Sequence, residues 1–243
     1  MSNLREHVGQ SVRDRKLFRR GERILVAVSG GLDSMVLLHL LRPLAARNHW
    51  KLFVAHFNHQ LRGRSSEADA RLVGKTAATL DLPFSVGAGP VRALALERAE
   101  SIEMVARELR HKFLARTATR LRIRRVALAH HADDQVELFF LRLLRGAGGE
   151  GIAGMKWQSP SPANPKLQLV RPLLDVSRAD LEQFAQQNKI RFREDASNAS
   201  RDFLRNRIRH ELLPGLRDRF QPALNQTVLR LMKIVGAEAQ FVE

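Results

Sequence analysis

Apolar and polar positions follow two periods along this chain, one typical of strands and one typical of helices. Short apolar runs, such as residues 24–28, predict buried strands, and apolar residues spaced three and four apart predict amphipathic helices. The predicted strands are 23–28, 51–57, 83–86, 125–129 and 167–170. The predicted helices are 1–20, 33–47, 66–80, 98–120, 133–145, 177–188 and 222–235.

Strands and helices therefore alternate over most of the chain. This order predicts an α/β fold: a doubly wound, mainly parallel five-stranded sheet with helices on both faces, plus a helical C-terminal extension. We expect a basic N-terminal helix at 1–20, a main domain at 21–196 and a basic helical extension or linker at 197–243. Residues 157–166, which are rich in proline and serine, are expected to form an exposed loop.

Composition narrows the class of protein. The 243 residues are 44% hydrophobic, which permits a sizeable core, and they hold no apolar run long enough to span a membrane. The basic N-terminus lacks the apolar stretch of a secretory signal. The absence of cysteine excludes disulfides, thiolate zinc sites and cysteine nucleophiles. We expect a cytoplasmic protein with no membrane partner.

The formal net charge of +16 points to a polyanionic partner, and arginine supplies most of the excess. The alternative is a solvated basic surface in an arginine-rich proteome. The few aromatic residues, 6% of the chain, disfavour a platform built from many stacking rings.

The most informative segment is Ser29-Gly30-Gly31-Leu32-Asp33-Ser34, between the first strand and the next helix. Glycines let the backbone approach a ligand closely, and a helix N-terminus attracts anions. The serines add hydroxyl donors, and Asp33 suits a divalent cation bound through phosphates. The segment predicts a site for the pyrophosphate end of a nucleotide. Gly-Gly alone often makes only a tight turn, and no Gly-Lys-Ser/Thr follows as in a Walker loop.

Two polar segments follow later strands. Residues 56–63 could line a nucleoside pocket, although His56 and His59 taken singly are more typical of ordinary loop residues. Residues 130–137 hold two histidines and two aspartates, but consecutive histidines cannot share one helical face, which disfavours zinc. Mg²⁺ bound through phosphates suits Asp134 better, and Asp133 could also serve as a helix N-cap.

Two further segments carry arginines. Arg107 and Arg110, three apart on a predicted helix, share a face and could hold a triphosphate, although helical arginines usually face solvent. Residues 194–198 form a polar loop before a basic element whose Arg205, Arg207 and Arg209 are candidates for RNA contact.

Together these segments resemble one family, the tRNA(Ile)-lysidine synthetases, over about residues 20–235. The glycine-rich string resembles the PP-loop of N-type ATP pyrophosphatases, so 21–196 would be a PP-loop catalytic domain. The matching residues are 29–34, 58–62, Ala106, Arg107, Arg110, 133–137, Arg145, Gly146, Gly148, Glu194, Asp195, Ser197, Asn198, Arg205 and Asn206.

The resemblance implies a ligase. ATP would adenylate the C2 oxygen of the first anticodon cytidine in the minor isoleucine tRNA with a CAU anticodon. The side-chain amine of free lysine would then displace AMP, leaving lysidine. Related PP-loop thiolases work through cysteines, which this chain lacks. ATP and Mg²⁺ are the implied cofactors.

The resemblance also implies residue roles. The catalytic residues would be Asp33, Arg107, Arg110 and Asp134, with Mg²⁺ on Asp33 and Asp134. The expected ATP-binding residues are Ser29, Gly30, Gly31, Leu32, Asp33, Ser34, Asn58, Arg62, Arg107 and His130. Asn58, His59 and Arg62 would surround the nucleoside or the incoming cytidine, and RNA would contact Arg205, Arg207 and Arg209.

The chain departs from the family in length. Many members carry further C-terminal tRNA-binding domains, which we expect to be absent here, so the chain is predicted to be a catalytic fragment or a short form. The apolar face of helix 222–235 could pack on its own domain, on a missing domain or on a second copy, so a homodimer is possible. Two rival functions stay open: a PP-loop ligase that adenylates another base or a small molecule, and a non-catalytic RNA-binding protein.

Overall fold

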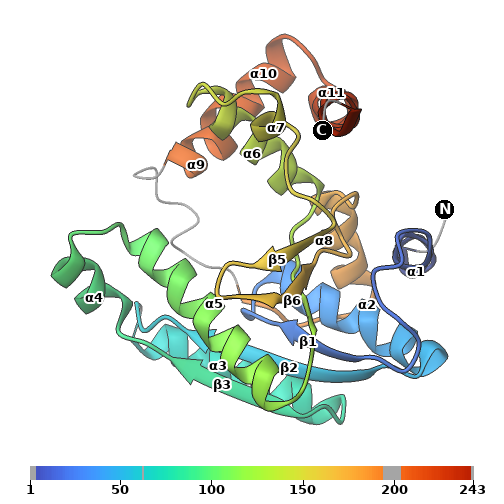
Figure 1. Ribbon diagram of the computed structural model, residues 1–243, viewed down its shortest axis with the longest axis vertical. Helices are drawn as coiled ribbons and strands as arrows, with labels where there is room; N and C mark the ends of the chain where they lie inside the picture. The colour runs from blue at the N-terminus through green and yellow to red at the C-terminus, as the bar shows by residue number, and fades with distance from the viewer. Residues whose placement is uncertain (1–3, 62, 194–203, 242–243) are drawn as a thin grey trace. The chain divides into compact units, whose positions relative to one another are not determined.

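The computed structural model describes residues 4–61, 63–193 and 204–241 (Figure 1). The chain divides into two compact units. The first unit comprises residues 1–129, 157–172 and 180–193, and the second comprises 130–156, 173–179 and 194–243. The second unit contains residues from both sides of position 196, where the sequence analysis expects the main domain to end. That domain boundary stays a prediction.

The first unit contains one sheet of six strands within the described residues, in the order β3-β2-β1-β4-β6-β5. The strands are β1 (Arg23–Ala27), β2 (Lys51–Asn58), β3 (Phe84–Ala88), β4 (Arg125–Ala127), β5 (Gln158–Ser161) and β6 (Asn164–Val170). All neighbours pair in parallel except β5 and β6, which are antiparallel. The chain winds outward through β2 and β3 and then returns to β4 on the other side of β1. The predicted doubly wound, mainly parallel sheet is therefore confirmed.

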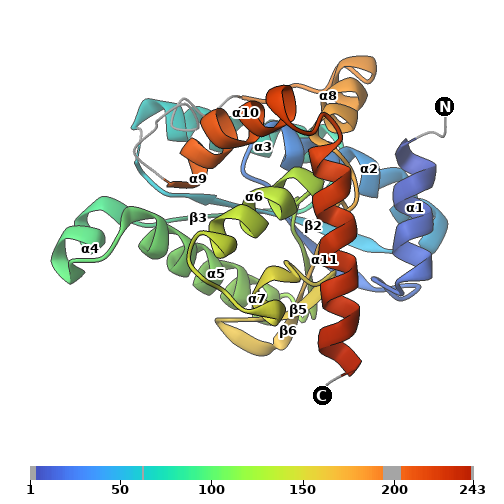
Figure 2. The same cartoon turned by 90° about the horizontal axis from the view of Figure 1, so that it is seen from above.

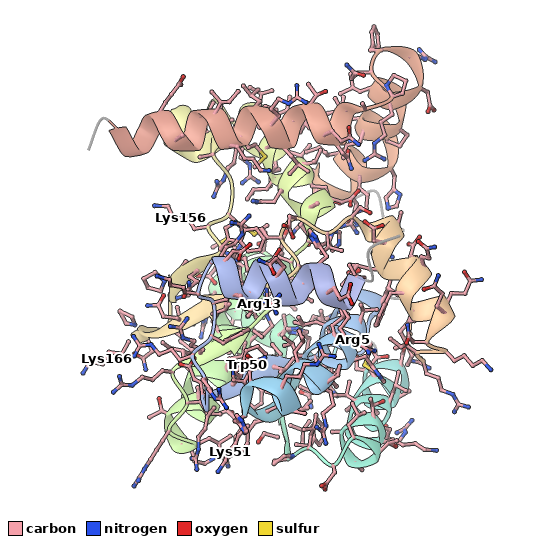
Figure 3. The ribbon with its side chains drawn as sticks, turned by 90° about the vertical axis from the view of Figure 1, so that its right-hand side faces the viewer. Arg5, Arg13, Trp50, Lys51, Lys156 and Lys166 are labelled. Carbon is pink, nitrogen blue, oxygen red and sulfur yellow. The ribbon has the colours of Figure 1, made fainter. Side chains whose placement is uncertain are left out.

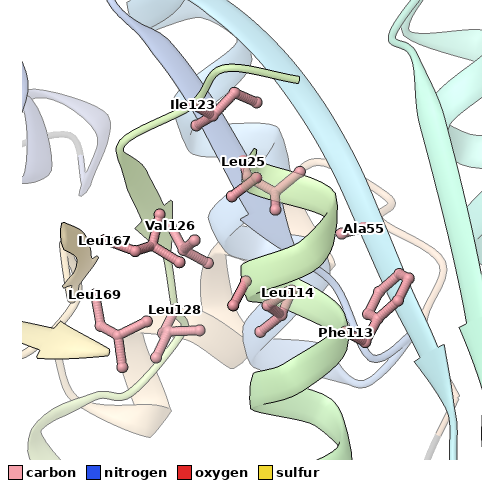
Figure 4. Packing of buried hydrophobic residues seen from close by; sticks show 11 residues of the cluster. Leu25, Ala55, Phe113, Leu114, Ile123, Val126, Leu128, Leu167 and Leu169 are labelled. Atoms are coloured by element: carbon pink, nitrogen blue, oxygen red, sulfur yellow. The ribbon is translucent and has the colours of Figure 1, made fainter. Parts of the chain in front are cut away.

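Helices of the first unit cover the sheet on both faces. They are α1 (Leu4–Asp14), α2 (Leu32–Asn48), α3 (Arg64–Thr79), α4 (Val91–Arg98) and α5 (Ile102–Arg120). Figure 4 shows α5 against β1, β2 and β4, where Phe113 and Leu114 pack with Leu25, Val126 and Leu169. Side chains alternate along a strand, so Ile24 and Val26, both fully buried, lie on the face of the sheet that is opposite to α5.

Two sequence predictions were wrong at element boundaries in this unit. The predicted helix 98–120 begins four residues later, as α5 at Ile102, because Ala99 adopts φ +52° and Ser101 caps α5 by accepting a hydrogen bond from the Met104 N–H at 3.2 Å. The preceding helix α4 was not predicted. The predicted helix 1–20 ends at Asp14, after which Leu17 and Phe18 are buried. Phe18 meets the Trp50 ring edge-on at 5.2 Å, and Trp50 is labelled in Figure 3.

The prediction of an exposed loop at 157–166 was also wrong, because residues 158–161 form β5 and residues 164–166 begin β6. This strand lies at the edge of the sheet, where Pro160 can sit despite lacking an N–H donor. The sheet consequently has one strand more than the five predicted.

The second unit is built from helices. They are α6 (Ala132–Leu143), α7 (Gly149–Ile152), α9 (Leu204–Arg207), the π-helix Ile208–Leu212, α10 (Leu213–Arg219) and α11 (Leu224–Phe241). Figure 2 shows α11 running beside α7, and α11 also contacts α6. Val136 and Phe139 of α6 share a core with Val228 and Met232 of α11. The apolar face of the closing helix thus packs on its own unit, while Leu231 stays 44% exposed.

The helix α8 (Arg178–Gln187) begins in the second unit and continues into the first. No helix in the described ranges combines the length and the apolar character that a membrane span requires.

Candidate functional site

The glycine-rich segment forms a tight loop between β1 and α2, at the point where the order of strands reverses. Open α/β sheets bind ligands at such switch points, beside the carboxyl ends of strands. Gly30 adopts φ +97°, and a Cβ there would lie 3.5 Å from side-chain atoms of both Asp69 and Val73 of α3. A non-glycine residue would be strained in this backbone conformation.

Two hydroxyl groups hold the loop in shape. The Ser34 hydroxyl donates to the Gly31 carbonyl at 3.0 Å and accepts from the Ser29 N–H at 3.1 Å. The two serine hydroxyls also lie 3.1 Å apart. Gly31 is the N-cap of α2, so the 17-residue helix directs its positive end at this loop. The loop is therefore preorganised to receive an anion.

Asp33 lies in the first turn of α2 and is half-buried. Leu32, the first residue of α2, is buried. The structure thus places predicted residues 29–34 together in one loop and helix start.

His56 contacts the backbone at the start of this loop. It is buried on β2, and its Nδ1 lies 2.9 Å from the Val28 carbonyl, at the entry to the loop. Burial lowers the pKa of His56, while the hydrogen bond to Val28 and the charge of Asp69 oppose that shift. The imidazole is therefore a neutral structural group, in line with its expected ordinary role.

The remaining nucleoside candidates lie at the end of β2. The Asn58 side chain accepts from the Gln60 N–H at 2.8 Å and so shapes the turn, and the His59 ring packs edge-on against Phe57 at 4.9 Å. Arg62 lies outside the described residues, as do residues 194–198 of the predicted polar loop.

Arg107 and Arg110 share α5 as predicted, and the structure adds a third arginine. Arg171 follows β6, is 7% exposed and donates to the Ser159 hydroxyl at 3.1 Å. Burial and then the charge of Arg107 lower the pKa of Arg171 to about 10. Sequence reasoning missed this residue, although an arginine between the apolar stretches 167–170 and 172–174 was an available signal.

His111 lies among these arginines and is 4% exposed. Burial first, and then the charges of Arg110, Arg107 and Arg171, lower its pKa to about 4. His111 is therefore neutral near pH 7, so the local charge comes from the arginines. This basic cluster of Arg107, Arg110 and Arg171 can stabilise an anion.

The second unit holds a different arrangement, a carboxylate–arginine cluster at the start of α6. Arg205 donates from Nη2 to Asp134 at 2.6 Å and from Nε to Glu137 at 2.8 Å. Arg209 donates to both oxygens of Glu137, at 2.5 and 2.9 Å. Glu137 is 2% exposed, so its charge is neutralised inside the unit. Sequence reasoning did not single out Glu137 for this role.

Asp134 is also bound by the backbone, since it accepts from the His131 N–H at 3.0 Å. Burial opposes ionisation of Asp134, but the charges of His131, Arg205 and His130 and this hydrogen bond together lower its pKa. The aspartate is ionised, with both oxygens already bonded. Its predicted role as a Mg²⁺ ligand, and that of His130 in binding ATP, stay predictions.

Asp133 does not cap α6, since the N-cap of that helix is His131. Its carboxylate instead accepts from the Arg178 N–H at 2.8 Å, at the first residue of α8, and from the Asn225 amide at 2.9 Å. The candidate N-cap interpretation was wrong for α6, because Asp133 lies inside the first turn.

Of the three arginines predicted to contact RNA, two turn toward carboxylates of α6. Arg207 alone of the three is exposed. Within the described residues, no group of three or more histidine or acidic side chains is arranged to hold a metal ion.

Comparison with known proteins matches residues 2–216 to a family described as "PP-loop domain". A "tRNA(Ile)-lysidine synthase" from Porphyromonas gingivalis is 40% identical over 241 residues, which cover 98% of this chain and 50% of that protein. One from Geobacter sulfurreducens is 42% identical over 220 residues, covering 90% and 45%. The resemblance inferred from the motifs is confirmed, and the chain spans about half the length of these curated relatives.

Among solved structures, a U34-tRNA thiolase from Methanococcus maripaludis with its [4Fe-4S] cluster superposes with a TM-score of 0.74. The two sequences are 15% identical, and the match covers 95% of this chain and 79% of the thiolase. At this identity the similarity establishes the fold alone.

Proposed function

This chain belongs to the PP-loop domain family, and on that premise we propose that its glycine loop binds the triphosphate of ATP for the adenylation of an RNA base. The observation that carries the proposal is the buried Gly30, held at φ +97° beside two serine hydroxyls and the N-terminus of α2. Backbone N–H groups and hydroxyls gathered at a helix start suit phosphate oxygens. Ser29, Gly30, Gly31 and Ser34 would bind the pyrophosphate portion.

Asp33 fits a cation at this loop. A carboxylate in the first turn of α2 supplies a hard oxygen ligand, and Mg²⁺ in proteins is commonly held by one or two carboxylates plus substrate phosphates. Bound Mg²⁺ would neutralise charge on the departing pyrophosphate. Asp33 would hold the cation, and the basic cluster on α5 and after β6 would stabilise negative charge at the α-phosphate.

The similarity to relatives named tRNA(Ile)-lysidine synthase extends the proposal to the substrate. The C2 oxygen of the first anticodon cytidine attacks the α-phosphorus of ATP, and pyrophosphate leaves. The side-chain amine of lysine then attacks C2 and AMP leaves, so lysidine forms. Placing the base oxygen in line with the α-phosphorus accounts for part of the rate enhancement. Because the 243 residues contain no cysteine, they offer no thiolate ligand for an iron–sulfur cluster.

The test is incorporation of labelled lysine into an isoleucine tRNA transcript with a CAU anticodon, in the presence of Mg²⁺ and ATP, with a methionine tRNA as control. Label in the isoleucine tRNA alone supports the full proposal. Label in both keeps the chemistry and removes the discrimination. AMP formed with RNA but without label keeps adenylation and excludes lysine as the nucleophile. If neither label nor AMP forms and ATP does not bind, the proposal is wrong.

A further inference from the structure

A hollow of about 520 Å³ opens on the first unit, between α3 and the chain that follows α8. Helix α3 contributes Ala68, Arg71, Leu72 and Lys75, and residues 190–193 supply the other wall. The α3 residues follow the spacing i, i+3, i+4, i+7, so they form one stripe along the helix. This hollow is outside every site predicted from the sequence.

An adjacent face of α3 packs against the glycine loop. Asp69 and Val73 lie on that face, next to Gly30. The other wall of the hollow also reaches the loop, because the Arg193 N–H donates to the Gly30 carbonyl at 3.0 Å and its Nε donates to Asp69 at 2.6 Å. The hollow is therefore connected to the proposed ATP loop through Asp69 of α3 and Arg193.

The charged side chains that line the hollow in the described part of the chain are all basic. Arg193 is held by Asp69, and Arg71 meets Glu67 at 3.6 Å in a solvent-exposed pair that contributes little. Lys75 and Arg191 are exposed. The rim of the hollow therefore carries exposed positive charge, which complements a polyanion.

The hollow also offers an apolar surface. Phe192 is 36% exposed and lies between Arg191 and Arg193, with Leu72 of α3 also lining the hollow. An aromatic ring flanked by cations suits an unpaired nucleotide, because the base can stack on the ring while its phosphates bind the cations. A duplex would use the cations but leave the ring without a stacking partner.

We propose that this hollow binds a single-stranded segment of the RNA substrate, with a base stacked on Phe192 and the flanking phosphates on Lys75 and Arg191. The inference rests on the proposed function for the identity of the RNA. It provides an RNA contact in the same unit as the glycine loop, distinct from the arginines of the second unit.

The test uses a fluorescently labelled anticodon-loop RNA and fluorescence anisotropy, without ATP or lysine. The variants are the double variant Lys75→Glu/Arg191→Glu and the single variant Phe192→Ala. The matched control is Lys51→Glu/Lys166→Glu, which reverses two exposed charges elsewhere on the first unit; both lysines are labelled in Figure 3. Affinity for a non-hydrolysable ATP analogue is measured in parallel, as a check that the fold and the loop are intact.

The double variant should weaken RNA binding at least about tenfold and reduce the slope of log affinity against log salt by about two. Phe192→Ala should weaken it roughly fivefold or more, since base stacking is lost. The control should bind RNA within about twofold of the unmodified chain, and all variants should bind the ATP analogue normally.

RNA affinities equal to that of the unmodified chain in both hollow variants would overturn the inference, as would absence of RNA binding by the unmodified chain. Loss of ATP-analogue binding by the hollow variants, with unchanged RNA binding, would also overturn it. The two proposals fail separately. Reduced RNA binding by the variants, with no lysine incorporated by the unmodified chain, supports the hollow and refutes the reaction. If both hollow variants incorporate lysine at the normal level and bind RNA with unchanged affinity, the reaction is supported and the hollow is refuted.

Discussion

The glycine loop of the first unit and the carboxylate–arginine cluster of the second use polar groups in opposite ways. In the loop, N–H groups and hydroxyls are gathered at a helix start by residues that are neighbours in sequence. In the cluster, Glu137 and Asp134 are neutralised by Arg205 and Arg209, which lie about 70 residues away along the chain. The first arrangement is prepared for a ligand, whereas the second satisfies its own charges.

The largest effect is expected from Asp33→Asn. The change keeps the size of the side chain and removes the charge that would hold Mg²⁺ beside the phosphates. We expect AMP formation in the presence of tRNA to fall at least about 100-fold, with the thermal unfolding midpoint nearly unchanged. Full activity in this variant would remove Asp33 from the site.

Glu137→Ala tests the other side of the comparison. It leaves the half-buried guanidinium groups of Arg205 and Arg209 without this carboxylate, which should cost about 1–3 kcal/mol of unfolding free energy in urea denaturation. The exposed Glu97→Ala is the matched control and should change stability by under about 0.5 kcal/mol.

A paired replacement separates the loss of the charge pair from the loss of packing. Glu137→Met combined with Arg209→Met should recover part of the stability lost in Glu137→Ala, because two apolar side chains leave fewer charges unpaired. A Glu137→Ala variant as stable as the unmodified chain would show that the cluster is no more self-contained than the loop.

Acid should destabilise the two regions in different pH windows. His111, in the first unit, has a folded pKa of about 4 against an ordinary 6.5, so between these values only the unfolded chain binds the proton. Stability should therefore fall by up to about 1.4 kcal/mol per pH unit as pH drops from about 6.5 to 4.

Asp134 acts at lower pH, since its folded pKa lies below its ordinary 3.8. Its contribution is present above that value and is lost as pH falls through the folded pKa. Urea denaturation of His111→Gln across pH 3 to 7 should show a flatter dependence above about pH 4 only, with exposed His7→Gln as control. An unchanged dependence would contradict the assignment of a neutral buried His111.

Ser101→Ala should have the smallest effect. The hydroxyl accepts one hydrogen bond at the start of α5, and loss of such a cap typically costs about 1 kcal/mol. Ser101→Asn should restore most of it in the same denaturation experiment. A cost as large as that of Glu137→Ala would erase the distinction between local and long-range polar contacts.

The same distinction explains what the sequence could predict. Strand and helix periods, and the loop at 29–34, depend on adjacent residues, so the mainly parallel sheet, its winding and the position of this loop after the first strand were predicted, whereas the edge strand β5 was not. Contacts between distant residues leave no local pattern. The pairing of Arg205 and Arg209 with α6 could not be predicted from spacing, and the apolar surroundings of Arg171 in the sequence indicate its burial but not its position beside α5.

Some local features were also missed where they compete with a stronger pattern. Helix α4 (Val91–Arg98) was not predicted, and α5 begins only after Ala99 and the Ser101 cap. Strand β5 contains Pro160, a residue that indicates a loop unless the strand lies at an edge. The hollow at α3 depends on side chains from two segments more than 100 residues apart.

The central claim is that the loop at Gly30 is the ATP site, and calorimetric titration of a non-hydrolysable ATP analogue tests it most directly. Gly30→Ala is compared with Gly21→Ala, because both glycines have positive φ and a Cβ at Gly21 would meet nothing within 4 Å. The account predicts that both variants lose similar stability, of about 1–2 kcal/mol, and that only Gly30→Ala loses at least tenfold in analogue affinity. Equal affinity in the two variants would contradict it.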